Sequence, residues 1–385
     1  MRPARSALLV TTGLVASLLA GCAESGAPSG PETASAVAVV AARPARTVDG
    51  WPTTTPARAG FDPKRLTGLA REAKQLDSSC YAVVRKGRLV GDWNWGVPRL
   101  TPREVFSVTK SVTSTLVGIA LRDRLLSLDD RVARYVPSWR GTDSATVTVR
   151  NLLSNDSGRF WSMESDYSVM THARNRTAYA VGLSQQHAPG TAWAYNNAAI
   201  QVLDRVLATA TGMPTADFAA KRLFAPLGMT HTRMTRDASG HSTNVYFGLQ
   251  TTCLDLARFA RLYLQKGAVD GRRVLSTAYV QAATGAASTT LNAAYGYLWW
   301  LNRYGQLRGP TDPVDAAGQP VTQHVGRLVP DAAPSLFSAI GLGGQIEMVD
   351  RRSRTIVVRL GRNATGVPQP YGLRNAARVV TWALG

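Results

Sequence analysis

The chain has 385 residues, and 45% of them are hydrophobic, which is enough to build the core of one large domain or two ordinary ones. This composition excludes a disordered or fibrous protein. The formal net charge is +19, but no basic run is interleaved with aromatic residues, so we expect no nucleic-acid partner. The charge favours residence near anionic lipid or wall polymers, or else it is a solvated arginine-rich surface without a partner.

The first 21 residues are typical of an export signal. Arg2 and Arg5 precede a short apolar stretch, and Leu19-Ala20-Gly21-Cys22 follows it. Small residues directly before a cysteine resemble the lipobox of bacterial lipoproteins, which implies cleavage before Cys22 and lipid attachment to it. We therefore expect an extracytoplasmic protein of the bacterial cell envelope, held at the lipid bilayer through acylated Cys22. The alternative is a simple secretory signal in which Cys22 is incidental.

Residues 22–50 are rich in Ala, Ser, Gly and Pro without apolar periodicity, which predicts a flexible tether before a domain at 51–385. Asp62-Pro63 is a good helix start, and the apolar residues after it predict a helix to about residue 75. Residues 80–84 and 89–95 predict two strands joined by a tight turn at Lys86-Gly87.

From residue 107 to about 290 the apolar pattern is mainly helical, and from 291 on it is mainly that of strands. Strands at both ends of the chain predict an α/β (α+β) fold, in which 51–106 and 291–385 complete one sheet and 107–290 form an inserted helical region. The predicted later helices are 107–122, 146–154, 196–211, 215–223, 252–266, 276–283 and 373–384, and the predicted later strands are 296–302, 335–340, 345–349 and 355–360.

Only one of the six lysines, Lys110, has a serine three residues before it. On a helix, residues i and i+3 share a face, so the Lys110 amine can lie beside the Ser107 hydroxyl and take its proton. The helix is rich in Ser, Thr and Val and must be held by burial, while its first turn points free N–H groups at the place where an oxyanion would form. The alternative is an ordinary Ser/Thr-rich core helix.

A second candidate motif, Tyr195-Asn196-Asn197, precedes another predicted helix. A phenol near a lysine ammonium has a lowered pKa, so Tyr195 could relay the serine proton to a leaving group, and Asn197 could orient Lys110 and a substrate carbonyl. Alone, Tyr195 could be a core residue and Asn197 a helix cap.

A third motif, Gly341-Leu342-Gly343-Gly344, lies between two predicted strands. Glycines let a backbone N–H approach a substrate closely, as the second half of an oxyanion hole requires. A glycine-rich turn without function is the alternative.

The order S-x-x-K, Y-x-N and glycine-rich strand end resembles the serine beta-lactamase and penicillin-binding-protein superfamily. Within it, the chain is most similar to class C beta-lactamase-related serine hydrolases of the 6-aminohexanoate-dimer hydrolase type. The likeness covers about residues 60–375 and includes LLSLDDRVARYVP at 125–137, VTVRNLLSNDSG at 147–158, LFAPLGM at 223–229, LDLARFARLYL at 254–264 and GYLWW at 296–300.

The resemblance implies an antiparallel sheet flanked by terminal helices and an enzyme that needs no cofactor or metal. By the same resemblance, the catalytic residues are Ser107, the nucleophile, and Lys110 and Tyr195, which together act as its base. The N–H groups of Ser107 and Leu342 form the oxyanion hole, and the substrate is contacted by Asn197, Tyr167, Gly341 and Gly343.

One departure bears on the substrate. Penicillin-processing relatives carry Lys-Thr-Gly or His-x-Gly at the third motif, whereas this chain has Ala339-Ile340-Gly341 or Gly341-Leu342-Gly343, without a cation in either register. Hydrolysis of a small-molecule amide or ester is therefore favoured over D,D-peptidase or beta-lactamase activity. A catalytically idle envelope protein of this fold is the remaining alternative, and the absence of a G-x-S-x-G elbow counts against an alpha/beta-hydrolase.

The remaining cysteines, Cys80 and Cys253, are an even pair in an oxidising compartment, so they form either one disulfide or two unrelated buried thiols. No cysteine or histidine spacing typical of a metal site occurs.

Overall fold

The computed structural model describes residues 47–312, 323–362 and 370–385. The predicted signal peptide, Cys22 and all but the last residues of the predicted tether lie outside the described residues. The described residues start before the expected domain boundary at Trp51, and β1 (Thr47–Val48) pairs with β2 (Trp51–Pro52). Within the described ranges, no helix combines the length and apolarity needed to cross a bilayer.

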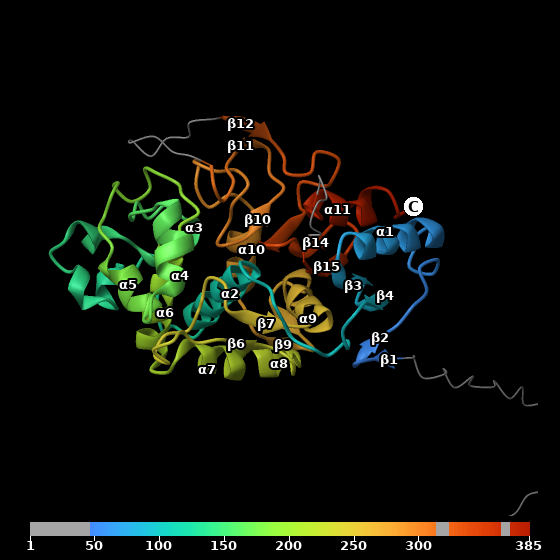
Figure 1. The fold of residues 1–385 in the computed structure, drawn as a ribbon, viewed down its shortest axis with the longest axis horizontal. Coiled ribbons are helices and arrows are strands. Elements are labelled where there is room, and N and C mark those ends of the chain that lie inside the picture. Colours follow the sequence, from blue (N-terminus) through green and yellow to red (C-terminus); the bar gives the residue numbers. More distant parts are fainter. Residues whose placement is uncertain (1–46, 313–322, 363–369) are drawn as a thin grey trace, which may run out of the picture. The chain divides into compact units, whose positions relative to one another are not determined.

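A six-stranded antiparallel sheet is built from both ends of the chain, as the sequence predicted (Figure 1). Its strand order is β10-β13-β14-β15-β3-β4. The strands are β3 (Ser78–Arg85), β4 (Arg88–Asn94), β10 (Trp300–Leu301), β13 (Phe337–Gly341), β14 (Gln345–Asp350) and β15 (Thr355–Gly361). The predicted strand at 296–302 is reduced to β10, because Leu298 adopts a left-handed conformation (φ 58°) and the chain reverses between Tyr295 and Trp300.

Helices cover both faces of this sheet (Figure 1). The terminal helices α1 (Pro63–Gln75) and α11 (Leu373–Thr381) pack on one face, and α2 (Val108–Arg122) and α9 (Cys253–Leu264) pack on the other. Alternate residues of β3 enter two separate hydrophobic clusters: Tyr81 and Val83 face α1 and α11, whereas Ala82 and Val84 belong to the cluster of α2 and α9.

The middle of the chain is helical, with short strands between the helices. The further helices are α3 (Val149–Ser154), α4 (Met170–His172), α5 (Arg176–Gly182), α6 (Asn197–Thr211), α7 (Thr215–Ala219), α8 (Ala225–Leu227) and α10 (Thr277–Thr284), with single turns at η1 (Val132–Arg134), η2 (Pro137–Trp139), η3 (Asp143–Thr146), η4 (Ser165–Val169) and η5 (Ala220–Phe224). The short strands are β5 (Arg103–Glu104), β6 (Arg233–Met234), β7 (Leu249–Thr251), β8 (Ala268–Val269), β9 (Arg272–Arg273), β11 (Gly305–Leu307) and β12 (His324–Gly326).

Caps decide several of these boundaries. The side chain of Asp62 accepts hydrogen bonds from the backbone of Lys64 and Arg65, and Pro63 opens α1, as predicted. Helix α3 begins at residue 149 rather than at 146, because Thr148 caps it through a capping box with Asn151.

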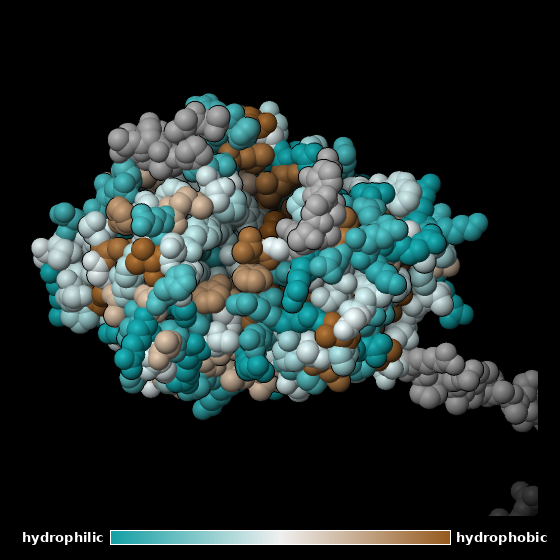
Figure 2. Space-filling view, viewed as in Figure 1, coloured by the Kyte–Doolittle hydropathy of each residue, from teal (hydrophilic) through white to brown (hydrophobic). Residues whose placement is uncertain are grey.

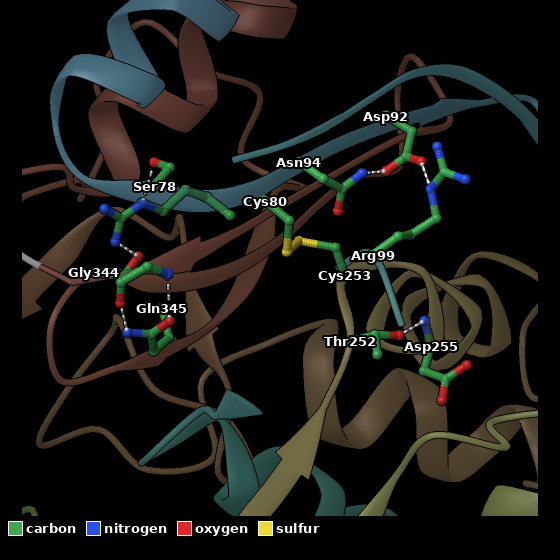
Figure 3. The surroundings of a disulfide bond; sticks show 12 residues. Ser78, Cys80, Asp92, Asn94, Arg99, Thr252, Cys253, Asp255, Gly344 and Gln345 are labelled. Atoms are coloured by element: carbon green, nitrogen blue, oxygen red, sulfur yellow. Dashed lines mark hydrogen bonds and ion pairs between the residues drawn. A yellow bond between two sulfur atoms is a disulfide. The ribbon is translucent and has the colours of Figure 1, made fainter. Parts of the chain in front are cut away.

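A disulfide joins the sheet to the helical region. Cys80 of β3 and Cys253 at the start of α9 lie 173 residues apart in the sequence, and their sulfur atoms are 2.06 Å apart (Figure 3). The sequence left open either one disulfide or two unrelated buried thiols, and the structure contains the disulfide.

Candidate active site

Ser107 is placed by a sharp change of backbone direction between β5 and α2. Phe106 has a left-handed conformation (φ 48°), which is uncommon outside glycine, and Ser107 is the first flanking residue of the helix. The N–H of Leu249 donates to Thr109 Oγ1 at 2.9 Å, and that hydroxyl donates to the carbonyl of Phe106 at 2.6 Å. The turn that presents Ser107 is thus fixed from the neighbouring strand β7.

Helix α2 is buried from Val108 to Ala120, which explains why a sequence of poor helix formers is helical here. Its hydroxyl groups bond to the surrounding elements: Ser111 donates to the Leu298 carbonyl at 2.7 Å, and Thr113 donates to the Val245 carbonyl at 2.6 Å. These bonds fix the helix that carries the serine and the lysine.

Lys110 lies one helical turn after Ser107 and is 1% exposed. Its Nζ donates to Ser107 Oγ at 2.7 Å and to the carbonyl of Tyr246 at 2.9 Å. Burial lowers the pKa of Lys110 to about 7, against a smaller opposing effect of the Asp166 carboxylate. A large share of this amine is therefore neutral at physiological pH and able to accept the serine proton.

Tyr195, in the loop before α6, is buried beside the same serine. Its ring stacks on Trp300 with 5.6 Å between centroids, and both Tyr195 and Ser107 line the same cavity. Burial raises the pKa of Tyr195 well above its usual value, whereas the sequence argument expected a lowered pKa. Burial disfavours the charged form, so the phenol keeps its proton.

Asn197 is the first residue of α6, and the cap is its neighbour Asn196, whose side chain accepts from the Ala199 N–H at 2.7 Å. The reading of Asn197 as a cap is therefore wrong. Tyr167, a residue of η4, is 40% exposed. Asn197 itself is buried.

A cavity of about 790 Å³ opens above Ser107 and Tyr195. Figure 2 shows hydrophobic residues in brown gathered in a recess near the top of the view. The described residues that line the cavity come from the catalytic loops, the β11–β12 region, the end of β13 and the start of α11: Ser107, Tyr167, Tyr195, Trp300, Leu307, Arg308, Gly309, Pro310, Thr311, Asp312, His324, Leu328, Ile340, Gly341, Leu342, Pro370, Gly372, Leu373, Arg374 and Asn375. An apolar wall with a few polar groups is typical of a small-molecule site.

The third motif meets this cavity through Ile340, Gly341 and Leu342. Among the backbone hydrogen bonds of the described residues, none has the N–H of Ser107 or of Leu342 as its donor. Neither N–H group is therefore taken up by a backbone acceptor in these ranges, and their use as an oxyanion hole stays a prediction. Gly343 is not among the lining residues, and its carbonyl points to Arg359, so the structure gives no support for it as a substrate contact.

Comparison with known proteins identifies the family of this chain. The sequence pattern of the family described as Beta-lactamase matches residues 65–380. This chain belongs to the beta-lactamase family. A beta-lactamase of Lysobacter lactamgenus is 30% identical over 199 residues, covering 44% of this chain and 51% of that protein. Penicillin-binding protein 4 of Amycolatopsis lactamdurans is 32% identical over 209 residues, with coverages of 45% and 53%, so the chain spans about half the length of both relatives.

The fold of this beta-lactamase-family chain also matches solved structures. A Bacillus anthracis protein assigned as a 6-aminohexanoate-dimer hydrolase superposes with a TM-score of 0.65 at 18% identity, covering 83% of each chain. At this identity the likeness establishes the shared fold, which is the one that the sequence predicted.

One residue of this beta-lactamase-family site was missed by the sequence analysis. Asp166 is fully buried, and its carboxylate accepts from the Asn197 N–H at 2.5 Å and from the Ala198 N–H at 3.4 Å. Burial raises its pKa, and its charge acts on Lys110. The only sequence signal was an acidic residue directly before Tyr167, and nothing local links it to a lysine 56 positions earlier.

Proposed function

We propose that this chain is a serine hydrolase that cleaves an amide or ester bond through an acyl-enzyme on Ser107. The observation that carries the proposal is the 2.7 Å hydrogen bond from Lys110 Nζ to Ser107 Oγ at the wall of an apolar cavity. An idle binding protein of the same fold has no need of a buried amine whose pKa is about 7 beside a serine hydroxyl.

Acylation follows from the positions of these groups. The neutral Lys110 amine takes the Ser107 proton while Oγ forms a bond to the substrate carbonyl carbon, and the carbonyl electron pair moves to oxygen. The N–H groups of Ser107 and Leu342 donate to this oxyanion. When the carbonyl reforms, the bond to the leaving nitrogen or oxygen breaks, and Tyr195 passes the proton from Lys110 to it.

Deacylation uses the same groups in reverse. Lys110, neutral again, takes a proton from a water molecule whose oxygen attacks the acyl carbon. Ser107 Oγ then leaves with that proton, and the carboxylic acid is released. Because both halves need only side chains and backbone N–H groups of this chain, we include no cofactor in the proposal.

A fluorophosphonate probe tests the activity. We expect intact-mass analysis to show one adduct on the wild type and none on Ser107→Ala. Ser111→Ala is the matched control, since Ser111 is a buried serine one turn along the same helix that bonds to Leu298. An unlabelled wild type, or a Ser107→Ala variant that is labelled and still cleaves small esters, would sink the assignment and favour an idle protein.

We propose further that the mature protein is a lipoprotein of the bacterial cell envelope, attached to the bilayer by acylated Cys22. The support is the Leu19-Ala20-Gly21-Cys22 sequence after a basic and apolar start. Metabolic labelling with a radiolabelled fatty acid should mark the wild type and not Cys22→Ser. A wild type without label would instead be a simple secreted enzyme.

A further inference from the structure

The turn between β13 and β14 carries the second oxyanion donor. It consists of Leu342, Gly343 and Gly344, and the two glycines have φ values of 77° and 74°. Residues other than glycine rarely adopt this left-handed backbone conformation. Leu342 is 72% exposed at the cavity mouth, so its own side chain does little to fix the backbone. Something else has to hold the turn in place.

Arg359 of β15 lies behind this turn and is fully buried. Its Nη1 donates to the carbonyls of Gly343 and Gly344 at 2.8 and 3.1 Å. Its Nε donates to Ser78 Oγ at 2.7 Å, and its Nη2 donates to the carbonyls of Leu76 and Arg362 at 2.7 and 2.6 Å. All five guanidinium N–H groups therefore donate hydrogen bonds, and two of them donate to the turn.

Gln345, the first residue of β14, holds the same turn from the other side (Figure 3). Its Nε2 donates to the carbonyl of Leu342 at 3.2 Å, and its Oε1 accepts from the N–H of Gly361 at 3.0 Å. The carbonyls of three successive residues, 342 to 344, thus each have a side-chain donor.

On the upstream side the backbone is pinned by a close approach to the loop before Ser107. A Cβ added at Gly341 would lie 2.1 Å from the carbonyl oxygen of Val105. The peptide that carries the Leu342 N–H is therefore bounded by this contact before it and by the Arg359 and Gln345 bonds after it.

We infer that Arg359 and Gln345 are positioning residues that aim the N–H of Leu342 at the oxyanion formed on Ser107. The inference rests on the proposed hydrolase function. Among the ion pairs of the described residues, none involves Arg359. The Asp77 carboxylate acts on this guanidinium from beyond ion-pair distance, and the buried charge lies behind the turn, where it favours a negative oxygen on the other side.

The variants separate geometry from charge. Arg359→Lys keeps the charge, but an ammonium with three N–H groups cannot reach all five acceptors. Gln345→Met keeps the length of the side chain and removes the donor to Leu342. Arg85→Lys is the matched control, because Arg85 of β3 likewise bonds backbone carbonyls, those of Ser353 and Ala59. Neither Arg359 nor Gln345 is among the described residues that line the cavity, and nor is Arg85.

Two measurements are made on each variant, after active sites are counted by fluorophosphonate titration. The first is the acylation rate with p-nitrophenyl butyrate. The second is the inhibition constant of phenylboronic acid, in which Ser107 Oγ bonds to boron, the proton passes to Lys110, and a tetrahedral anion occupies the oxyanion hole. Loss of a whole oxyanion donor costs roughly 10²–10³ in rate, so misplacing one should cost at least about tenfold.

We expect Arg359→Lys and Gln345→Met to lower the acylation rate per active site and to raise the boronate inhibition constant in parallel, while Arg85→Lys changes neither. If Arg359→Lys loses titratable sites through misfolding, Gln345→Met decides alone. Variants that acylate at the wild-type rate, or that lose rate without any change in boronate inhibition, overturn the inference. A wild type that forms no adduct overturns the proposed function itself.

Discussion

The amine of Lys110 lies 4.7 Å from the centre of the Tyr195 ring, over its face, and it donates hydrogen bonds to Ser107 Oγ and to the carbonyl of Tyr246. Lys110 therefore contacts both the serine hydroxyl and the ring of Tyr195. Since burial lowers the pKa of one and raises the pKa of the other, the two groups have different tasks. In the proposed mechanism, Lys110 is the base and Tyr195 is a proton donor.

This division predicts different losses for the two variants. Lys110→Ala should lower kcat/KM by at least about 10²-fold with every substrate, because general-base catalysis contributes about that much. Tyr195→Phe should harm a linear amide far more than a p-nitrophenyl ester, because an amine must be protonated to leave and p-nitrophenolate need not be. Steady-state kinetics with both substrates checks this, and equal losses on ester and amide would contradict a leaving-group role for Tyr195.

The pH dependence should report the protonation of Lys110. The free enzyme is competent when the amine is neutral, so kcat/KM should rise with pH through about 7, the pKa that burial gives to Lys110. The Asp166 carboxylate raises this pKa. Asp166→Asn removes the charge and keeps an oxygen to accept from the Asn197 N–H, so the rising limb should move to lower pH.

Asp204→Asn is the control for this pH shift. Asp204 is another buried carboxylate, which accepts from the Thr177 hydroxyl at 2.8 Å and whose charge is not among the causes that shift the Lys110 pKa. Its replacement should leave the limb in place. If the rising limb of the kcat/KM profile of Asp166→Asn does not move, or moves to higher pH, the carboxylate does not act on Lys110.

The parts of the site that sequence could predict are the local ones. Ser107 and Lys110 lie three residues apart on one helix, and Asp62 caps α1 through the N–H groups two and three residues after it. Both contacts can therefore be predicted from a short stretch of sequence. Asp166 and Arg359 meet their partners only through the fold, at sequence separations of 56 from Lys110 and 15 from Gly344. The prediction that the pKa of Tyr195 is lowered was wrong for the same reason, because burial, which raises it, depends on the tertiary structure.

The disulfide should stabilise the fold by restricting the unfolded chain. Its loop of 173 residues would be assigned on the order of 4–5 kcal/mol by chain-entropy models, and measured values are usually smaller. The double variant Cys80→Ala, Cys253→Ala should therefore unfold at lower urea concentration than the wild type. In the mature protein, unfolded without a reducing agent, alkylation should find neither thiol, and two alkylated cysteines would refute the bridge.

The last prediction concerns the choice of substrate. A beta-lactam presents a carboxylate close to the scissile carbonyl, and a charge-assisted hydrogen bond to such a group contributes roughly 1.5–3 kcal/mol. The third motif meets the cavity with Ile340, Gly341 and Leu342, which provide no cation. Since each 1.36 kcal/mol is tenfold, discrimination in favour of the carboxylate should fall by roughly one to two orders of magnitude.

The apolar wall favours a different substrate. Trp300 and Tyr167 line the cavity and can contact a short acyl chain, whereas Trp299, the neighbour of Trp300 in the sequence, is buried in the core against Phe259 and Tyr263. We therefore expect kcat/KM for p-nitrophenyl acetate or butyrate, or for a short linear amide, to exceed that for a chromogenic cephalosporin by at least about tenfold.

Two arginines decide how a contrary result would be read. Arg308 and Arg374 also line the cavity, and both bond to backbone carbonyls: Arg308 to that of Trp193 and Arg374 to that of Leu328, each at 3.3 Å. Arg374 is exposed, so it is the guanidinium that could turn to a substrate carboxylate. Faster turnover of the cephalosporin than of the esters, lost again in Arg374→Ala, would show that the cation comes from α11 and that the enzyme acts as a beta-lactamase.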